Sequence, residues 1–202
     1  MPRSKKYIEG EVLHRAMELF RKRGFDSTSV RDLEREMGIN QFSIYASFRS
    51  KRELFLKSLE NYREFAEIDL YARLFEPDAN LGDLKNLLEE MLNNTDKGER
   101  LGCLVVNTTG TTLVNDSEIS DELLRYYGFI RAMLRRLAER SVEEGILPFN
   151  TDIDSYASYL LGVMQGFSVG LRIMPADQLR SFLDISFRTG IAPTVYNKAP
   201  CP

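Results

Sequence analysis

Three consecutive side chains, those of Gln41, Phe42 and Ser43, have the chemistry needed to contact the edges of DNA bases. A Gln side chain can pair with adenine through two hydrogen bonds, and a Phe ring can pack against a thymine methyl group. A Ser hydroxyl can form a hydrogen bond with any of several bases. Donors suited to phosphate oxygens, which fix position rather than sequence, lie close by in the chain. They are Thr28, Arg31, Tyr45 and Lys51, and Ser29 and Asn40 complete the predicted DNA-binding set.

Two short helices joined by a tight turn are expected to position these groups. Apolar residues at helical spacing predict the first helix over residues 30–37, and Ser29 with Asp32 fits the capping box that opens a helix. Gly38 follows at the position where a helix end needs a residue that tolerates the left-handed conformation.

Asn40 is a suitable N-cap for the second helix, which is predicted over residues 41–48. If Ile44 and Phe48 face the core, Phe42 must point outward. An exposed aromatic ring on a short helix favours a role in binding a partner. Two short helices with a Gly-containing turn form a helix-turn-helix, whose second helix enters the DNA major groove. Two packed helices of an ordinary bundle have the same pattern, so the pattern alone leaves both interpretations open.

The first third of the chain resembles the DNA-binding signature of the TetR family of bacterial transcriptional repressors. The resemblance is carried by Gly38-Ile39-Asn40-Gln41-Phe42-Ser43-Ile44-Tyr45, followed by Phe48, Ser50, Lys51 and Leu54. It implies a three-helix head, a helical body, and phosphate contacts from Tyr45 and Lys51. The chain departs from the signature at Phe42, where the family often has a small residue. It departs also at Ala46 and Ser47, so the usual phosphate contact at Ser47 is expected to be weakened or lost.

Charge is distributed unevenly along the 202 residues, whose formal net charge is −3. Residues 1–63 hold 14 Lys or Arg and 9 Asp or Glu, which gives +5, and the remaining residues carry −8. A basic front and an acidic rear are typical of a DNA-contacting head on a body that does not contact DNA. Residues 1–7 are expected to form either a basic arm near the DNA or a frayed terminus.

The composition argues against catalytic, metal and membrane functions. The chain has one His, His14, and two Cys far apart in sequence, Cys103 and Cys201, so no zinc spacing or disulfide is expected. No apolar run approaches the about 18 residues that span a bilayer, and no signal-peptide core is present, which favours a cytoplasmic location. We expect no cofactor and no enzymatic activity. A helical enzyme, or a helical small-molecule carrier that does not bind DNA, remains as an alternative.

The rest of the chain is also predicted to be helical. Residues 102–114 are apolar and β-branched, which favours a strand on propensity, but a lone strand would have no partner, so a short buried helix is predicted. Together the pattern gives an all-α protein of about nine helices. We divide it into a helix-turn-helix DNA-binding domain (residues 1–50) and an effector-binding and dimerisation domain of about six helices (residues 51–202). The other helices are predicted over residues 7–23, 51–74, 81–93, 118–144, 152–174 and 175–189.

Three glycines, Gly162, Gly166 and Gly170, recur every four residues in one predicted helix. Each Gly costs roughly 1 kcal/mol of helix propensity relative to Ala, so such a stripe indicates the close approach of another backbone. The neighbour is either a helix of the same chain or a dimer mate, and the resemblance implies a dimer interface built from the last two helices. A two-fold dimer would read a palindrome with half-sites about one helical turn, or a multiple, apart.

The resemblance also implies a body that encloses an unidentified small-molecule effector, whose binding tilts the helix at Lys51 and releases operator DNA. Cys103 lies at a predicted helix start near Lys97 and Arg100, a setting that favours the thiolate. Its Gly-Cys-Leu context resembles repressors that respond to electrophiles or oxidants, and a buried inert Cys is the alternative. The other candidate pocket residues, for which core packing is an equal explanation, are Tyr62, Phe65, Asn107, Thr108, Thr111, Tyr126, Tyr127, Met133, Met164, Gln165 and Phe167.

Overall fold

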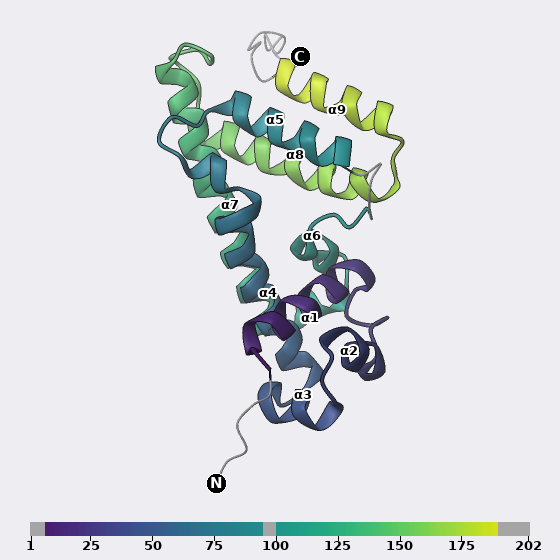
Figure 1. Cartoon of the computed structure of the whole chain (residues 1–202). Helices are drawn as coiled ribbons and strands as arrows, with labels where there is room; N and C mark the ends of the chain where they lie inside the picture. Colours follow the sequence, from purple (N-terminus) through teal and green to yellow (C-terminus); the bar gives the residue numbers. More distant parts are fainter. Residues whose placement is uncertain (1–6, 95–99, 190–202) are drawn as a thin grey trace, which may run out of the picture. The chain divides into compact units, whose positions relative to one another are not determined.

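The computed structural model describes residues 7–94 and 100–189, and this part of the chain is all-α, as predicted (Figure 1). Most of the predicted basic arm, Lys97 and Cys201 lie outside the described residues. None of the described helices is long and apolar enough to cross a membrane. The α-helices are α1 (Glu9–Arg23), α2 (Val30–Met37), α3 (Gln41–Phe48), α4 (Lys51–Phe65), α5 (Leu81–Asn94), α6 (Leu104–Thr109), α7 (Ser117–Glu143), α8 (Ile153–Ile173) and α9 (Ala176–Thr189).

Two of the predicted helices differ in form from the structure. The helix predicted over residues 51–74 is α-helical only to Phe65. It continues as the π-helix η1 (Ala66–Leu70), in which the N–H of Tyr71 donates to the carbonyl of Ala66 at 2.8 Å, and then as the 3-10 helix η2 (Ala72–Phe75).

The segment 102–114 is helical, which confirms the choice of helix over strand, but it is divided. Helix α6 ends at Thr109, and the 3-10 helix η4 (Thr112–Asn115) follows. The break has a local cause, because the Thr111 hydroxyl accepts the N–H of Leu113 and starts the second segment.

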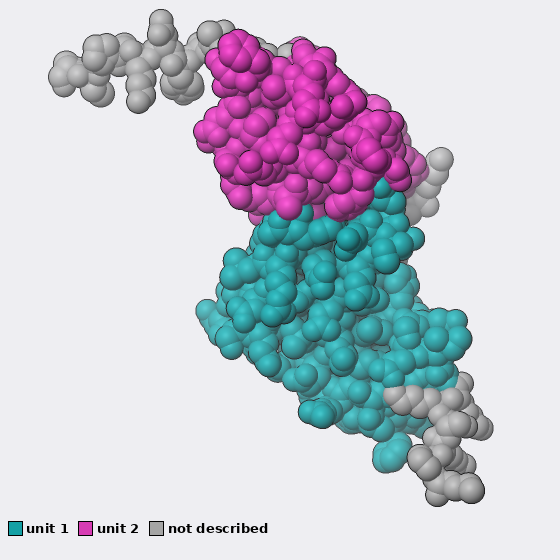
Figure 2. Space-filling view, turned by 90° about the vertical axis from the view of Figure 1, so that its left-hand side faces the viewer, with its two compact units in different colours: residues 1–72, 100–129 teal, residues 73–99, 130–202 magenta. Residues whose placement is uncertain are grey.

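The chain forms two compact units, coloured separately in Figure 2. Unit 1 comprises residues 1–72 and 100–129, and therefore holds α1 to α4, η1, α6, η4 and the first part of α7. Unit 2 comprises residues 73–99 and 130–202, with α5, the rest of α7, α8 and α9. The functional division predicted at residue 50 does not follow these units and stays a prediction.

The core of unit 1 is aromatic where α1 and α4 pack on each other. The rings of Phe20 and Phe55 meet edge to face with centroids 5.0 Å apart, and Phe25 lies 5.2 Å from Phe55. Helices α2 and α3 contact this pair of helices, and each buries apolar side chains on one face. The short helices α2 and α3 therefore gain their stability from packing, since helices this short are marginal alone in water.

In unit 2, helices α5, α8 and α9 lie side by side (Figure 1). A Cβ added to Gly170 would lie 2.7 Å from Cδ1 of Leu179, and one added to Gly166 would lie 3.3 Å from Cζ of Phe182. Both contacts come from α9 of the same chain. A Cβ on Gly162 meets nothing within 4 Å, so this end of the stripe is open.

Candidate nucleic-acid interface

Helix α2 begins and ends as its sequence predicts. The Ser29 hydroxyl accepts the N–H of Asp32 at 3.1 Å, and the Asp32 carboxylate accepts the N–H of Ser29 at 3.1 Å, which completes the capping box. The hydrogen bond from the Ser29 hydroxyl is the main cause that lowers the pKa of Asp32 to about 2. Gly38 ends the helix in the left-handed conformation, with φ 69°.

The first turn of α3 is held by two acceptors. Oδ1 of Asn40 accepts the N–H of Ser43 at 2.9 Å, as expected for an N-cap. Oε1 of Glu34, on α2, accepts the N–H of Gln41 at 2.6 Å. Sequence reasoning missed Glu34, because a carboxylate in the middle of a polar helix gives no local signal of a partner across the turn.

The three predicted base-contacting side chains stand at the start of α3. Gln41 is exposed, Ser43 is half-buried, and the ring of Phe42 is 82% exposed. Ile44 and Phe48 are fully buried on the opposite side, which confirms that Phe42 points outward. Helix α3 thus presents a polar and an aromatic side chain to solvent at its N-terminal end.

Some of the side chains predicted to contact phosphate are open to solvent, and others contact residues of their own chain. Arg31 is exposed and Tyr45 is half-buried. The ammonium group of Lys51 lies 4.2 Å from the centroid of the Phe25 ring, and burial there lowers its pKa. The prediction that Thr28 contacts a phosphate is wrong. Its side chain is fully buried, and its hydroxyl donates to the carbonyl of Gly24 at 2.7 Å, so it cannot reach a phosphate.

Ser47 is engaged within the chain. Its Oγ lies 2.6 Å from the hydroxyl of Tyr7, which also donates to the carbonyl of Ser43 at 3.4 Å. Tyr7 therefore connects the segment before α1 to α3. The sequence did not single out Tyr7, because its partner lies 40 residues away.

Three of the predicted effector-pocket residues meet in the interior of unit 1. Sγ of Cys103 lies 3.6 Å from the hydroxyl of Tyr126, and the rings of Tyr126 and Tyr62 have centroids 5.7 Å apart. Tyr71 joins them as a residue that the sequence did not indicate. Burial raises the pKa of the three Tyr hydroxyls, so all three are neutral at pH 7. We call Tyr62, Tyr71, Cys103 and Tyr126 the tyrosine cluster.

A polar link between α1 and α6 lies beside the tyrosine cluster. Nε of Arg21 donates to the carbonyl of Gly102 at 2.7 Å, and the guanidinium lies 5.6 Å from the Tyr62 ring centroid. The Asn107 amide donates to the carbonyls of Arg21 and Leu101 at 3.2 and 3.0 Å. Asn107, predicted to line the pocket, therefore ties α6 to the end of α1.

The other predicted pocket residues are scattered over the two units. The hydroxyls of Thr108 and Thr111 donate to backbone carbonyls of Leu104 and Thr108. Phe65 lines an open surface hollow of about 440 Å³ with His14, Asn61, Glu64, Ile68 and Asp69. Tyr127 is half-buried in unit 1, whereas the buried Met133, Met164 and Phe167 and the half-buried Gln165 belong to unit 2.

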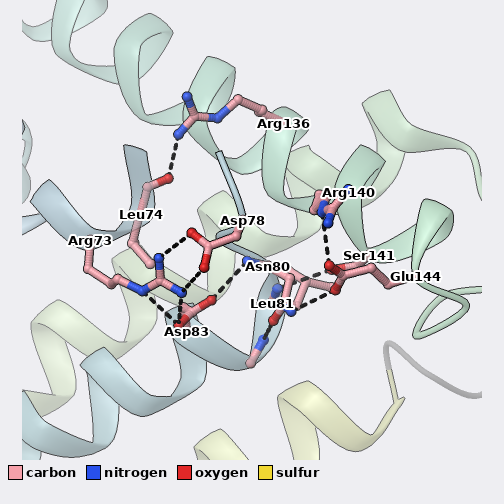
Figure 3. Close-up of polar contacts among 11 residues, drawn as sticks. Arg73, Leu74, Asp78, Asn80, Leu81, Asp83, Arg136, Arg140, Ser141 and Glu144 are labelled. Atoms are coloured by element: carbon pink, nitrogen blue, oxygen red, sulfur yellow. Dashed lines mark hydrogen bonds and ion pairs between the residues drawn. The ribbon is translucent and has the colours of Figure 1, made fainter. Parts of the chain in front are cut away.

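Unit 2 has its own polar network at the start of α5 (Figure 3). Arg73 pairs with Asp78 at 2.6 Å and with Asp83 at 3.1 Å. The hydroxyl of the buried Ser141 on α7 accepts the N–H of Leu81 at 3.0 Å, and so caps α5 from another helix. These contacts fix the segment before α5 onto α7, and we assign them a structural role.

Comparison with known proteins gives an independent view of the whole chain. An uncharacterized HTH-type transcriptional regulator of Bacillus subtilis, YezE, is 29% identical over 197 residues, which cover 92% of this chain and 97% of that protein. The Escherichia coli HTH-type transcriptional repressor ComR is 26% identical over 174 residues, 84% of this chain and 82% of that one. A cysteine mutant of the TetR family transcriptional regulator CifR, complexed with 26-bp operator DNA, matches with a TM-score of 0.77 at 26% identity, covering 93% and 99% of the two chains.

Two family descriptions match successive parts of the sequence. Residues 12–57 match the bacterial regulatory proteins of the tetR family, and residues 81–182 match the tetracyclin repressor-like C-terminal domain. The first match covers the helix-turn-helix and the second covers half of the chain. The chain therefore belongs to the TetR family of bacterial transcriptional regulators.

Proposed function

We propose that this transcriptional regulator is a repressor that binds palindromic operator DNA as a homodimer and releases it when a small molecule binds. The observation that carries the proposal is the start of α3. Side-chain oxygens accept two of its first N–H groups, and Gln41 and the 82% exposed Phe42 face solvent there. The operator DNA bound to CifR and the repressor name of ComR support it.

In this proposal, α3 enters the major groove and its first residues read base edges. Gln41 pairs with adenine and Phe42 packs on a thymine methyl group, while Ser43 tolerates several partners. Arg31, Tyr45 and Lys51 contact phosphates and fix the register of the helix. The Phe25 ring under the Lys51 ammonium holds this charge at the start of α4, next to the end of α3.

The proposed dimer uses α8 and α9. Val169 and Ile173 on α8 are 47% and 75% exposed, and Ile185 on α9 is 60% exposed. Apolar side chains exposed on two neighbouring helices favour an interaction surface, and the open Gly162 lies on α8 with Val169 and Ile173. A second copy of the chain, related by a two-fold axis, would cover this surface and place two α3 helices on two half-sites.

The proposed release begins at the tyrosine cluster. It adjoins the link from Arg21 to Gly102 and from Asn107 to Arg21, so a ligand that displaces Tyr62 or Asn107 would alter the contact between α6 and α1. Such a ligand acts only through a difference in its affinity for the two states. The burial of Cys103 supports a small molecule over modification of the thiol, which is the alternative trigger.

The test is DNA binding by gel shift with the sequence upstream of the chain's own gene, together with selection from random duplexes. Wild type is compared with Tyr45→Phe and Gln41→Ala at two salt concentrations. We expect Tyr45→Phe to weaken binding to all sequences and Gln41→Ala to relax base preference at one position. Absence of sequence-specific binding in both assays would contradict the proposal and favour the carrier or enzyme alternative.

A further inference from the structure

The carboxylate of Glu34 holds the helix that is proposed to read DNA. The first N–H groups of a helix have no partners within the helix itself. In α3, Asn40 accepts the N–H of Ser43, and Glu34 accepts the N–H of Gln41 at 2.6 Å. The Glu34 side chain is half-buried and forms no ion pair within the described residues. Its one hydrogen bond joins α2 to the residue that begins α3.

The position of this carboxylate matters for a DNA-binding helix. A helix N-terminus carries a partial positive charge, and its N–H groups bind phosphate regardless of base sequence. Helix α3 has no acidic residue in its own first turn. Glu34 therefore supplies the acceptor and the negative charge that this helix end lacks.

We propose that Glu34 is a positioning residue that directs the start of α3 toward base edges and denies its Gln41 N–H to DNA phosphates. This inference rests on the proposed DNA-binding function and adds a source of specificity to it. Because Glu34 occupies this N–H, the contacts to DNA phosphates are made by Arg31, Tyr45 and Lys51. The N-terminal end of α3 then adds to the affinity only through its contacts with base edges. Without Glu34, the same N–H donates to a phosphate of any sequence, and α3 loses its hydrogen bond to α2.

The chain offers a matched control in Glu36. It lies two residues further along α2, about 200° around the helix from Glu34. It is exposed and, within the part of the chain that the structure describes, its side chain forms no hydrogen bond or ion pair with α3. Substitution of Glu36 thus removes the same charge from the same helix without freeing the Gln41 N–H.

The experiment measures the ratio of affinities for the selected operator and for a scrambled duplex of equal length, using the full chain. The variants are Glu34→Gln, which keeps an acceptor oxygen, Glu34→Met, which keeps length and helix propensity but not the acceptor, and the controls Glu36→Gln and Glu36→Met. Amide hydrogen exchange at Gln41, measured in the free protein, reports the hydrogen bond directly. Glu34→Ala serves as a second acceptor-free variant if Glu34→Met fails to fold by circular dichroism.

We expect Glu34→Met to lower the specificity ratio about tenfold, because operator binding weakens while scrambled-duplex binding tightens. Glu34→Gln should retain the ratio within about twofold and protect the Gln41 amide. A merely destabilising role would weaken both duplexes together. Equal ratios in Glu34→Met and Glu36→Met would overturn the inference. A wild type that prefers no sequence would instead overturn the proposed function and the inference with it, and the wild-type measurement alone identifies that case.

Discussion

Arg52 and Asp116 form a two-pronged ion pair in which Nε and Nη2 each lie 2.6 Å from a carboxylate oxygen. The pair joins the first turn of α4 to the residue that precedes α7, and Glu118 adds a third contact at 2.6 Å. The Arg52 hydrogen bonds hold the pKa of Asp116 below its usual range. The helix that follows the helix-turn-helix is therefore fastened to the rest of unit 1 at its beginning.

Replacement of Arg52 by Lys should lower the melting temperature of the protein, because an ammonium group cannot form the paired hydrogen bonds of a guanidinium. Thermal unfolding followed by circular dichroism at pH 7 measures the change. Arg49→Lys, an exposed position nearby, is the control. A melting temperature equal to that of wild type would show that the paired hydrogen bonds add nothing to stability.

The Asp32 capping box predicts a pH dependence of stability. The folded-state pKa, about 2, lies below the value near 3.9 that Asp has in unfolded chains. The stabilisation is therefore present above pH 4 and is lost as the pH falls toward 2. Urea unfolding at pH 6 and pH 3 should show a larger loss for wild type than for Asp32→Asn. Identical losses in the two proteins would contradict this assignment.

Lys51→Met should reduce the slope of log affinity against log salt by about one, with the same loss on operator and scrambled DNA, because one phosphate contact disappears. Fluorescence anisotropy over a salt series gives both slopes. Lys57→Met is the matched control, since this exposed Lys lies on the same helix about 240° away. A slope that changes equally in both variants would remove Lys51 from the set of contacts.

Gly162→Glu should convert the proposed dimer to monomers without unfolding the chain. A side chain at this position meets nothing within 4 Å in its own chain, and Glu favours a helix more than Gly does. Sedimentation velocity separates the two species, and Gly128→Glu on α7, equally open, is the control.

The Cys103 thiol, 8% exposed, should resist a maleimide in the native protein and react once urea opens the fold. Mass spectrometry of wild type and Cys103→Ser, with and without urea, identifies the modified site. Rapid native modification accompanied by loss of DNA binding would reverse the choice between the two triggers and favour the thiol.

Local signals were sufficient to predict the helix-turn-helix. Helices α2 and α3 have the predicted bounds, because Ser29, Gly38 and Asn40 fix their ends through contacts with residues no more than four positions away. The outward direction of Phe42 followed from the same spacing. The partners in these interactions lie within about one helical turn of each other in sequence, so the sequence pattern alone predicts them.

Local sequence patterns did not predict the contacts between helices that are far apart in the sequence. Thr28 looks like a surface donor in sequence, yet its hydroxyl is buried against the end of α1. Asn107 has a polar amide in an apolar segment, which suits a pocket wall, but its partner on α1 lies 86 residues away. The Gly stripe predicted the close approach of another backbone, whereas the near neighbours of Gly166 and Gly170 are the side chains of Phe182 and Leu179 on α9, which only the fold could identify.

The π-helix after α4 gives this segment one residue that the helix could lose. Its wide turn, closed by the bond from Tyr71 to Ala66, holds one residue more than an α-helical turn would. Deletion of one residue between Ala66 and Leu70 would let the helix continue in ordinary α-helical register. The later side chains would keep nearly their present directions, because the π turn holds only the one extra residue. A deletion within α4 would instead rotate every later side chain by about 100° and take Tyr71 out of the tyrosine cluster. The π-helix is therefore the place in this segment where the residue count can change with the least effect on the tyrosine cluster.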